Sequence, residues 1–427
     1  MSTRNRKDCT ITRILLAGVI LLTMCLGFSS SAVTAQKPIK IGAMLHLSAV
    51  EPVLALMEKR GFEVAINEVG PIQGRPVELI VADVTSIEEM QSEARRLIKE
   101  GCNVLIGSSV DSWDKAIVPI AERNKVVLYL TLTGGPELTE LGSPWVFRTC
   151  PVSPDEGAFQ AEWFIDSMMG PLGLEVADVK AGLVYRDDSW GATMGENCSR
   201  VLREAGIPIV VEEYYSGEEV RDMTPVILKL KSAGVNAVFS GHFREGAILF
   251  YEAAEKYDFN PAVFIGTGAF EGTLQTVETL GVNGAEGLLA SNYPPENAPE
   301  DFARDVPKLI KVYRETYKEE IETPHYLSAY NGIMFLLDAL QRTEDLDSAE
   351  SIRDAIAATD IPEGEIGIGW GCKFSTAEEP WKGMVGQNMR SFFVGTQVFD
   401  GELWQVYPFA VPGKELAIPI PNWSEKR

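Results

Sequence analysis

The sequence predicts an α/β protein built from two units of similar size, each organised around a parallel β-sheet. Three observations support this fold class. Short apolar runs rich in β-branched residues alternate with amphipathic stretches along most of the chain. This alternation pauses near residues 147–151 and then restarts. The length of 427 residues allows two or three domains at ~100–200 residues each.

The first unit repeats a strand followed by a helix, as crossover connections between parallel strands require. Strands are expected at 39–45, 77–82, 104–106 and 126–130. Helices, recognised by apolar residues at helical spacing, are expected at 53–67, 86–100 and 114–123. In such folds the helices cover both faces of the sheet.

The second unit repeats the alternation after residue 151. Helices are expected at 155–169, 191–205, 223–233 and 245–256, and strands at 180–185, 209–215, 237–240, 262–266 and 287–291. The chain then becomes mainly helical, with helices expected at 302–320, 325–342 and 348–359. After a glycine-rich stretch at 364–372, Asp400-Gly401 predicts a hairpin turn between strands at 391–398 and 402–407.

Residues 1–35 have the three-part pattern of a secretory signal peptide. A basic segment, 1–13, precedes an uncharged apolar run at 14–28, which is shorter than the ~20 residues of a membrane span. Small residues follow, and those at 33–35 suit cleavage by a signal peptidase. A retained membrane anchor and lipoprotein processing at Cys25 are the alternatives; the large Met24 disfavours the second. The mature protein is therefore expected in the periplasm or elsewhere outside the cytoplasm.

The charge excludes polyanionic partners. The chain has 61 acidic and 38 basic residues, a net charge of -23, and removing the predicted signal peptide leaves 60 against 34, or -26. A surface this acidic repels nucleic-acid phosphates and anionic lipid headgroups.

Motifs of catalysis and metal binding are missing from the sequence. Only three histidines occur, His46, His242 and His325, and no zinc-protease, nucleophile-elbow or phosphate-loop motif is present. The glycine-rich loop at 266–272 has the wrong spacing for a dinucleotide site, and a tight strand-to-helix turn explains it better. The sequence therefore predicts no catalytic residues, no cofactor and no metal.

Four cysteines remain after the predicted cleavage, and none belongs to a C-x-x-C pair. Buried free thiols and disulfides in any of three full pairings both remain open. The four are Cys102, Cys150, Cys198 and Cys372.

The residues expected at the carboxyl ends of the strands favour binding, since ligands of α/β sheets lie there. Hydroxyl groups and glycines gather at 108–114 and 131–135, and such groups at a helix start suit a carboxylate. Aromatic rings of Trp113, Trp190 and Phe243 suit an apolar or cationic group. Any single serine or aspartate there could be a helix N-cap, and Trp113 could be a core residue, so the prediction depends on the whole set.

Five segments resemble one known family in their order and spacing. They are IKIGA at 39–43, GRPVEL at 74–79, PELT at 136–139, FRT at 147–149 and DSWG at 188–191. Together they resemble the extracytoplasmic solute-binding proteins of ABC transporters for branched-chain and related amino acids, over residues 38–410. This Leu/Ile/Val-binding family implies a type I periplasmic-binding fold, in which two Rossmann-like lobes are joined by three crossover strands.

The resemblance also implies lobe boundaries. Lobe one comprises 36–148 and 293–368, and lobe two comprises 149–292 and 369–412, with a C-terminal tail at 413–427. The crossovers are then expected at 147–151, 291–294 and 368–372. Ligand bound in the cleft between the lobes would stabilise a closed state reached by a hinge motion.

Carried over residue by residue, the family's ligand site has two halves. The loops that hold a ligand carboxylate match 109–112 and 132–134 on lobe one, and the aromatic positions match Trp190 and His242 on lobe two. The acid that neutralises a ligand ammonium falls at Gly268, so a flat or aromatic solute or an amide fits better than an α-amino acid. The expected ligand-binding residues are Ser109, Asp111, Ser112, Leu132, Thr133, Gly134, Trp190, His242, Gly268 and, by a different loop path, Glu271.

The sequence therefore predicts a substrate-binding protein without catalytic activity. It is expected to capture an amino acid or a related small carboxylate, amide or aromatic solute and to deliver it to a membrane ABC permease. A monomer that binds no nucleic acid is expected. The alternatives are a ligand-sensing module for a receptor or sensor kinase, which can share this fold, and a secreted enzyme, against which the missing catalytic triad argues.

Overall fold

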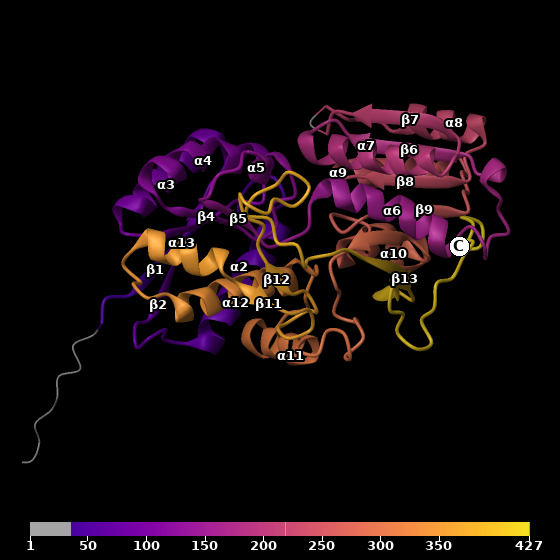
Figure 1. Cartoon of the computed structure of the whole chain (residues 1–427). Coiled ribbons are helices and arrows are strands. Elements are labelled where there is room, and N and C mark those ends of the chain that lie inside the picture. Colours follow the sequence, from indigo (N-terminus) through magenta and orange to yellow (C-terminus); the bar gives the residue numbers. More distant parts are fainter. Residues whose placement is uncertain (1–35, 218, 427) are drawn as a thin grey trace, which may run out of the picture. The chain divides into compact units, whose positions relative to one another are not determined.

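The computed structural model describes residues 36–217 and 219–426 (Figure 1). Pro38–Arg427 form one compact unit, separate from Met1–Lys37. The predicted signal peptide at 1–35, with Cys25, lies outside the described residues. Within the described residues, no helix combines the length and the apolar character needed to cross a membrane.

The first lobe is built on a five-stranded sheet in which every strand pair is parallel. Strands β1 and β3 are neighbours, so the chain winds outward in one direction to β2 and in the other through β4 to β5. The carboxyl ends of β1 and β3 therefore flank the point where the winding reverses, which is where such sheets bind ligands. The strand order is β2 (Val77–Asp83), β1 (Ile39–Leu45), β3 (Val104–Ile106), β4 (Val127–Leu130) and β5 (Val146–Arg148).

Helices cover both faces of this sheet because side chains alternate along each strand. On β1, Ile41 packs in the core beneath α2 and α12, whereas Met44 packs in the core beneath α3 and α4. Figure 1 shows the late helices α12 and α13 in the same lobe as the early helix α2, although the sequence separates them widely. The helices are α2 (Pro52–Val69), α3 (Ile87–Lys99), α4 (Asp111–Asn124), α5 (Glu137–Glu140), α11 (Val306–Tyr317), α12 (His325–Arg342) and α13 (Ala349–Ala357).

The second lobe is built on a seven-stranded sheet with five parallel strands and an antiparallel hairpin at one edge. The hairpin predicted around Asp400-Gly401 is confirmed, with both turn residues at positive φ. Ile420 and Trp423 of the C-terminal tail pack into this lobe's core. The strand order is β14 (Glu402–Tyr407), β13 (Val394–Phe399), β10 (Leu289–Asn292), β9 (Val263–Thr267), β8 (Ala237–Gly241), β6 (Ala181–Arg186) and β7 (Ile209–Tyr215).

Strands and helices alternate in this lobe as predicted, with a short 3₁₀ helix, η1, before β6. Helix α6 begins earlier than the expected residue 155, because Pro154 in its first turn needs no backbone N–H partner. The elements are α6 (Ser153–Ser167), η1 (Val176–Asp178), α7 (Ser189–Glu204), α8 (Thr224–Ala233), α9 (Arg244–Lys256) and α10 (Leu274–Ala285).

Three connections join the lobes, and the third lies later in the chain than the expected 368–372. Trp370 and Phe374 belong to the core of the first lobe, and Phe374 pairs with Asn388. The two-stranded sheet of β11 (Asp360–Ile361) and β12 (Cys372–Lys373) lies in this segment. The chain thus joins the second sheet only at β13, and the glycine-rich stretch is packed structure instead of a linker; Gly369 takes φ 99° there.

All four cysteines of the described residues are buried free thiols. Burial raises the pKa of the Cys150 and Cys198 thiols to about 12. The structure therefore selects free thiols over disulfides for Cys102, Cys150, Cys198 and Cys372.

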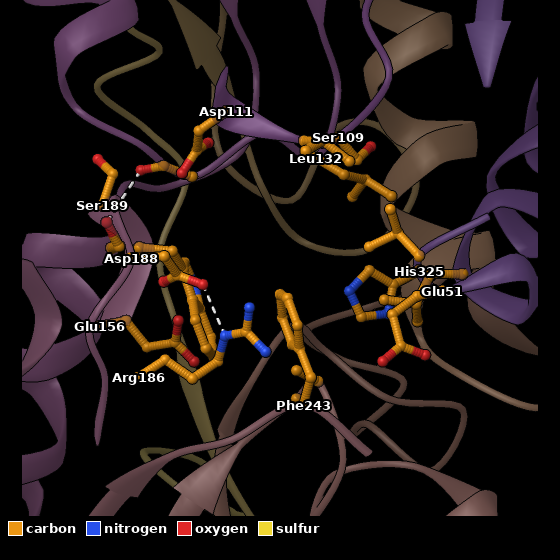
Figure 2. Close-up of a pocket in the computed structure, with 18 of the residues that line it drawn as sticks. Glu51, Ser109, Asp111, Leu132, Glu156, Arg186, Asp188, Ser189, Phe243 and His325 are labelled. Carbon is orange, nitrogen blue, oxygen red and sulfur yellow. Dashed lines mark hydrogen bonds and ion pairs between the residues drawn. The ribbon is translucent and has the colours of Figure 1, made fainter. Parts of the chain in front are cut away.

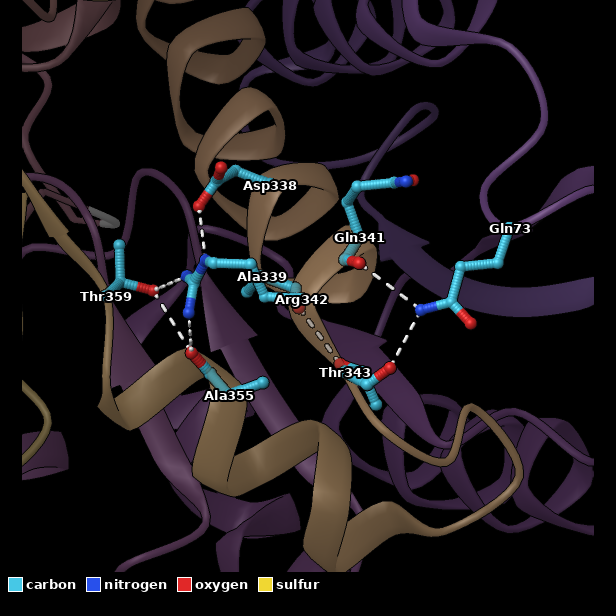
Figure 3. Close-up of polar contacts among 8 residues, drawn as sticks. All are labelled: Gln73, Asp338, Ala339, Gln341, Arg342, Thr343, Ala355 and Thr359. Carbon is cyan, nitrogen blue, oxygen red and sulfur yellow. Dashed lines mark hydrogen bonds and ion pairs between the residues drawn. The ribbon is translucent and has the colours of Figure 1, made fainter.

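The carboxyl end of α12 is held by side chains that satisfy its last carbonyl groups (Figure 3). The Gln73 amide donates to the carbonyl oxygens of Gln341, at 3.2 Å, and Thr343, at 2.7 Å. The Arg342 guanidinium reaches α13, donating to the Ala355 carbonyl at 3.1 Å, and also donates to the Thr359 hydroxyl at 2.8 Å. The Arg342 bonds thus attach α12 to α13, and the Gln73 bonds attach the turn after α2 to the end of α12.

Replacing Arg342 with alanine is expected to lower the free energy of unfolding by about 1–2 kcal/mol, because two bonds between elements are lost. Its ion pair with Asp338, at 2.9 Å, is half-exposed and adds little. Urea denaturation followed by circular dichroism measures the change. Arg95→Ala on α3 is the matched control, since Arg95 is exposed and bonds only to its own helix at Gln91. Equal midpoints for the two variants would contradict the prediction.

Candidate ligand-binding site

A pocket of about 350 Å³ lies between the two lobes and is lined by both (Figure 2). The first lobe contributes the segments that follow β1, β3 and β4, at the carboxyl ends of its strands. The second contributes the segments after β6, β8 and β9, together with the first turn of α6. The position agrees with the general rule for ligands of α/β sheets.

The wall on the first lobe is a set of hydroxyl groups held from behind by two buried acids. The Ser109 hydroxyl donates to Glu58 at 2.8 Å, and Thr131 donates to the other oxygen of the same carboxyl. The Thr133 hydroxyl donates to Asp114 at 2.6 Å. The orientation of these hydroxyls is thus fixed by partners inside the lobe.

The wall on the second lobe is an aromatic stack that carries one cation. The rings of Trp190 and Phe243 are stacked with centroids 5.0 Å apart and an angle of 21°. The Arg186 guanidinium lies 4.3 Å from the centroid of Phe243 and pairs with Asp188 at 2.6 Å. Asp188 also caps α7 by accepting from the Gly191 amide. The cap and the ion pair hold Trp190, in the first turn of α7, at the pocket wall.

The connections between the lobes supply a second aromatic group. Tyr293 follows β10, and its ring is stacked with that of Phe393 at 5.8 Å. His325 at the start of α12 contacts Tyr293, with ring centroids 5.3 Å apart. Ligand bound here would touch both lobes and the segments that connect them.

Three carboxyl groups that line the pocket are perturbed by burial. Desolvation raises the pKa of Glu51 and of Asp111 to about 7 each, and that of Glu156 to about 8. Desolvation lowers the pKa of His325 to about 4, so this histidine is neutral near pH 7. Among the residues that line the pocket, Arg186 is therefore the one positively charged side chain near pH 7.

Seven of the ten predicted site residues line the pocket. Ser109, Leu132 and Asp111 are labelled at its rim in Figure 2. The residues that the structure brings together are Ser109, Asp111, Ser112, Leu132, Gly134, Trp190 and Gly268.

The other three predicted residues, Thr133, His242 and Glu271, are not among the residues that line the pocket. Thr133 points into the lobe toward Asp114, because side chains alternate and its neighbours take the pocket side. His242 is fully buried, with Nδ1 2.8 Å from the Tyr215 hydroxyl. Glu271 lies behind β9 and accepts from the Tyr251 hydroxyl at 3.0 Å.

Sequence reasoning missed several lining residues. Glu156, Tyr293, His325 and Phe393 come from helix starts and lobe connections, which carry no strand-end signal. An acid in the first turn of a helix, such as Glu156, usually only offsets the helix dipole. The position of Glu156 beside Ser291, at 2.9 Å, becomes visible only in the folded chain.

Glu58 behind the first-lobe wall is expected to make stability depend on pH. Burial raises its pKa to about 8 from 4.5, although the Thr131 and Ser109 hydroxyls oppose the shift. Unfolding therefore releases a proton between these pH values, and stability is lost as pH rises through the folded pKa.

Replacing Glu58 with glutamine should remove this dependence. The difference in free energy of unfolding, wild type minus Glu58→Gln, is measured at each pH. This difference is expected to fall by up to about 1.4 kcal/mol per pH unit from pH 5 to 8. Urea denaturation at four pH values in this range measures it. Glu78→Gln on β2 is the control, since Glu78 is exposed; a parallel pH profile for wild type and Glu58→Gln would refute the prediction.

The sequence is similar to that of known periplasmic binding proteins. The sequence pattern of the periplasmic binding protein family matches residues 38–387. The Leu/Ile/Val-binding protein homolog 7 of Brucella suis is 27% identical over 394 residues, which cover 91% of this chain and 96% of the homolog. The homolog 8 from the same organism is 26% identical and covers 89% and 93%.

Solved structures show the same fold. The leucine-binding protein of Thermotoga maritima superposes with a TM-score of 0.71 at 22% identity, covering 86% of this chain and 97% of that one. A solute-binding protein of R. palustris in complex with benzoate gives a TM-score of 0.71 at 17% identity, covering 90% and 97%. The predicted type I periplasmic-binding fold is thus confirmed, and the chain belongs to the family of periplasmic binding proteins.

Proposed function

We propose that this chain is an extracytoplasmic substrate-binding protein that captures a small organic solute between its lobes and delivers it to a membrane ABC permease. One observation carries the proposal: the pocket of about 350 Å³ is lined by both lobes at the carboxyl ends of their strands. A solute bound there contacts both lobes at once, so it favours whichever arrangement brings them together.

The proposed solute is an amino acid or a related small carboxylate, amide or aromatic compound. The family relatives named for leucine, isoleucine and valine, and the R. palustris protein with benzoate, support this size class. The stacked rings of Trp190 and Phe243 favour a flat solute. Gly268 at the pocket supplies no acid for an α-ammonium group.

Closure is proposed to occur as a hinge motion at the three connections. Contacts between the lobes would then hold the closed form. The Ser189 hydroxyl at the start of α7 donates to Glu137 of the first lobe at 2.9 Å, and Lys382 pairs with Asp155 at 2.6 Å. Both pairs lie at the surface and are individually weak. Micromolar binding, about 8 kcal/mol, would therefore depend mainly on the buried solute.

Binding without chemistry is proposed because the pocket lacks a nucleophile paired with a base. His46 and His325 line it, but burial lowers the pKa of both rings. His46 Nδ1 lies 3.0 Å from the Ala49 carbonyl, and His325 Nδ1 lies 2.9 Å from the Thr323 hydroxyl. A monomer acting in the periplasm is proposed, with residues 1–35 as the export signal.

Mass spectrometry of solute released from purified, denatured protein tests the proposal. A small organic compound recovered in near-equimolar amount, which rebinds and reduces the radius of gyration in X-ray scattering, is the expected result. Turnover of the compound would overturn the binding role. Failure of the recovered compound to rebind or compact the protein would overturn the capture mechanism.

A further inference from the structure

The charge of the pocket lining points to the charge of its ligand. Four carboxyl groups line the pocket against a single guanidinium, and no lysine lines it. The four acids come from both lobes. They are Glu51, Asp111, Glu156 and Asp188, and the cation is Arg186.

The Arg186 guanidinium already has partners within the protein. It pairs with Asp188 at 2.6 Å and lies over the ring of Phe243 at 4.3 Å. The remaining acids, Glu51, Asp111 and Glu156, form no ion pair with any lysine or arginine of the described residues. Arg244 and Arg186 partly offset the burial of Glu51, and Arg148 partly offsets that of Asp111, but desolvation outweighs them and raises the pKa of all three carboxyl groups.

The first-lobe wall at Ser109, where a ligand carboxylate would be expected, is unfavourable for a carboxylate. Ser109 lines the pocket, and its hydroxyl donates to Glu58 at 2.8 Å. Ser108 and Thr133 do not line it, and their hydroxyls donate to Asp114 inside the lobe. A ligand carboxylate beside Ser109 would compete with this bond and would face the Glu58 carboxyl behind it. Arg148 cannot compensate, because it is fully buried and its donors are engaged within the first lobe.

The aromatic lining suits a flat cation. Trp190 with Phe243 and Tyr293 with Phe393 form two stacked pairs at the pocket. The negative faces of such rings attract cations, and more strongly when water is excluded. Carboxyl groups and aromatic faces together thus supply both the counter-charge and the contact surface for an organic cation.

We infer that the ligand of this pocket is a flat organic cation, such as an aromatic amidine or amine, and that it lacks a free carboxylate. The inference rests on the proposed function and narrows its ligand class. Glu156 is assigned as the counter-charge at the second lobe, because it is buried beside the Trp190 ring and accepts from the Ser291 hydroxyl at 2.9 Å. Glu51 and Asp111 are assigned the same role on the first lobe.

Benzamidine, benzamide and benzoate test the charge directly, because they share one flat shape and differ by one charge at each step. Isothermal titration with the protein from Gln36 to Arg427 is expected to give the tightest binding for benzamidine, at least 10-fold tighter than benzamide, with benzoate weakest. Benzoate or leucine binding more tightly than benzamidine would overturn the inference. Failure of all three to bind at 10 mM would also overturn it.

Two glutamine variants test whether the charge of Glu156, and not its shape, determines the affinity for benzamidine. Glu156→Gln keeps the shape of the side chain and should weaken benzamidine at least 10-fold while changing benzamide less than 3-fold. Glu162→Gln, an exposed acid on the same helix, is the matched control and should change neither. An equal loss for both probes in Glu156→Gln would count against the role of charge.

Mass spectrometry of the retained solute distinguishes this inference from the proposed function. A neutral or anionic solute that rebinds would refute the cation and leave solute capture intact. A protein that retains no solute and is stabilised by no compound in a thermal-shift panel would refute both.

Discussion

Replacing Arg148 with methionine is expected to lower the free energy of unfolding by about 3–5 kcal/mol. The guanidinium is fully buried and donates to Gln387 at 2.6 Å, to the Gly135 carbonyl at 2.5 Å and to the Thr139 hydroxyl. Burial lowers its pKa, and the nearby Asp111 carboxyl opposes that shift. Methionine would fill similar volume but leave several buried acceptors unsatisfied, which is the costly outcome.

The effect is large because these bonds connect three segments that are distant in sequence. The backbone of Arg148 also pairs with Gly386 and Asn388, so β5, the loop after β4 and the returning chain meet at one side chain. Urea denaturation measures the loss. Arg123→Met on α4 is the control, since Arg123 is exposed and bonds only to Pro119 of its own helix; it should change stability by less than about 0.5 kcal/mol. A loss of similar size in both variants would contradict the assigned role.

Much of the fold could be predicted because its signals are local. The apolar run of β1, the strand–helix repeat and the turn at Asp400-Gly401 each depend on neighbouring residues, and the structure agrees with them. The third connection could not be predicted, because the glycines near Gly369 suggested a linker. Trp370 packs instead in the first lobe's core, which is a property of distant chain segments.

The site shows the same division between local and distant information. The expected strand ends allowed the sequence to place Ser109, Gly134 and Trp190 at the site, and all three line the pocket. They did not predict which way Thr133 points, because one residue of shift moves a side chain to the opposite face. Glu156 and Phe393 could not be found at all, since a helix start brings the first into the pocket and a connection between the lobes brings the second.

Replacing Trp190 with alanine is expected to weaken solute binding by about 30- to 1000-fold, or 2–4 kcal/mol, as for a central aromatic contact. The indole is stacked on Phe243 at 5.0 Å and borders Gly134 of the first lobe. It therefore spans both walls and contributes most when the lobes are together. Titration of the recovered solute, or of benzamidine, measures the loss. Trp381→Ala, which changes a partly buried tryptophan outside the pocket, should bind like the wild type. Wild-type affinity in Trp190→Ala would show that the solute lies elsewhere, and the interlobe pocket would then lose its assigned role.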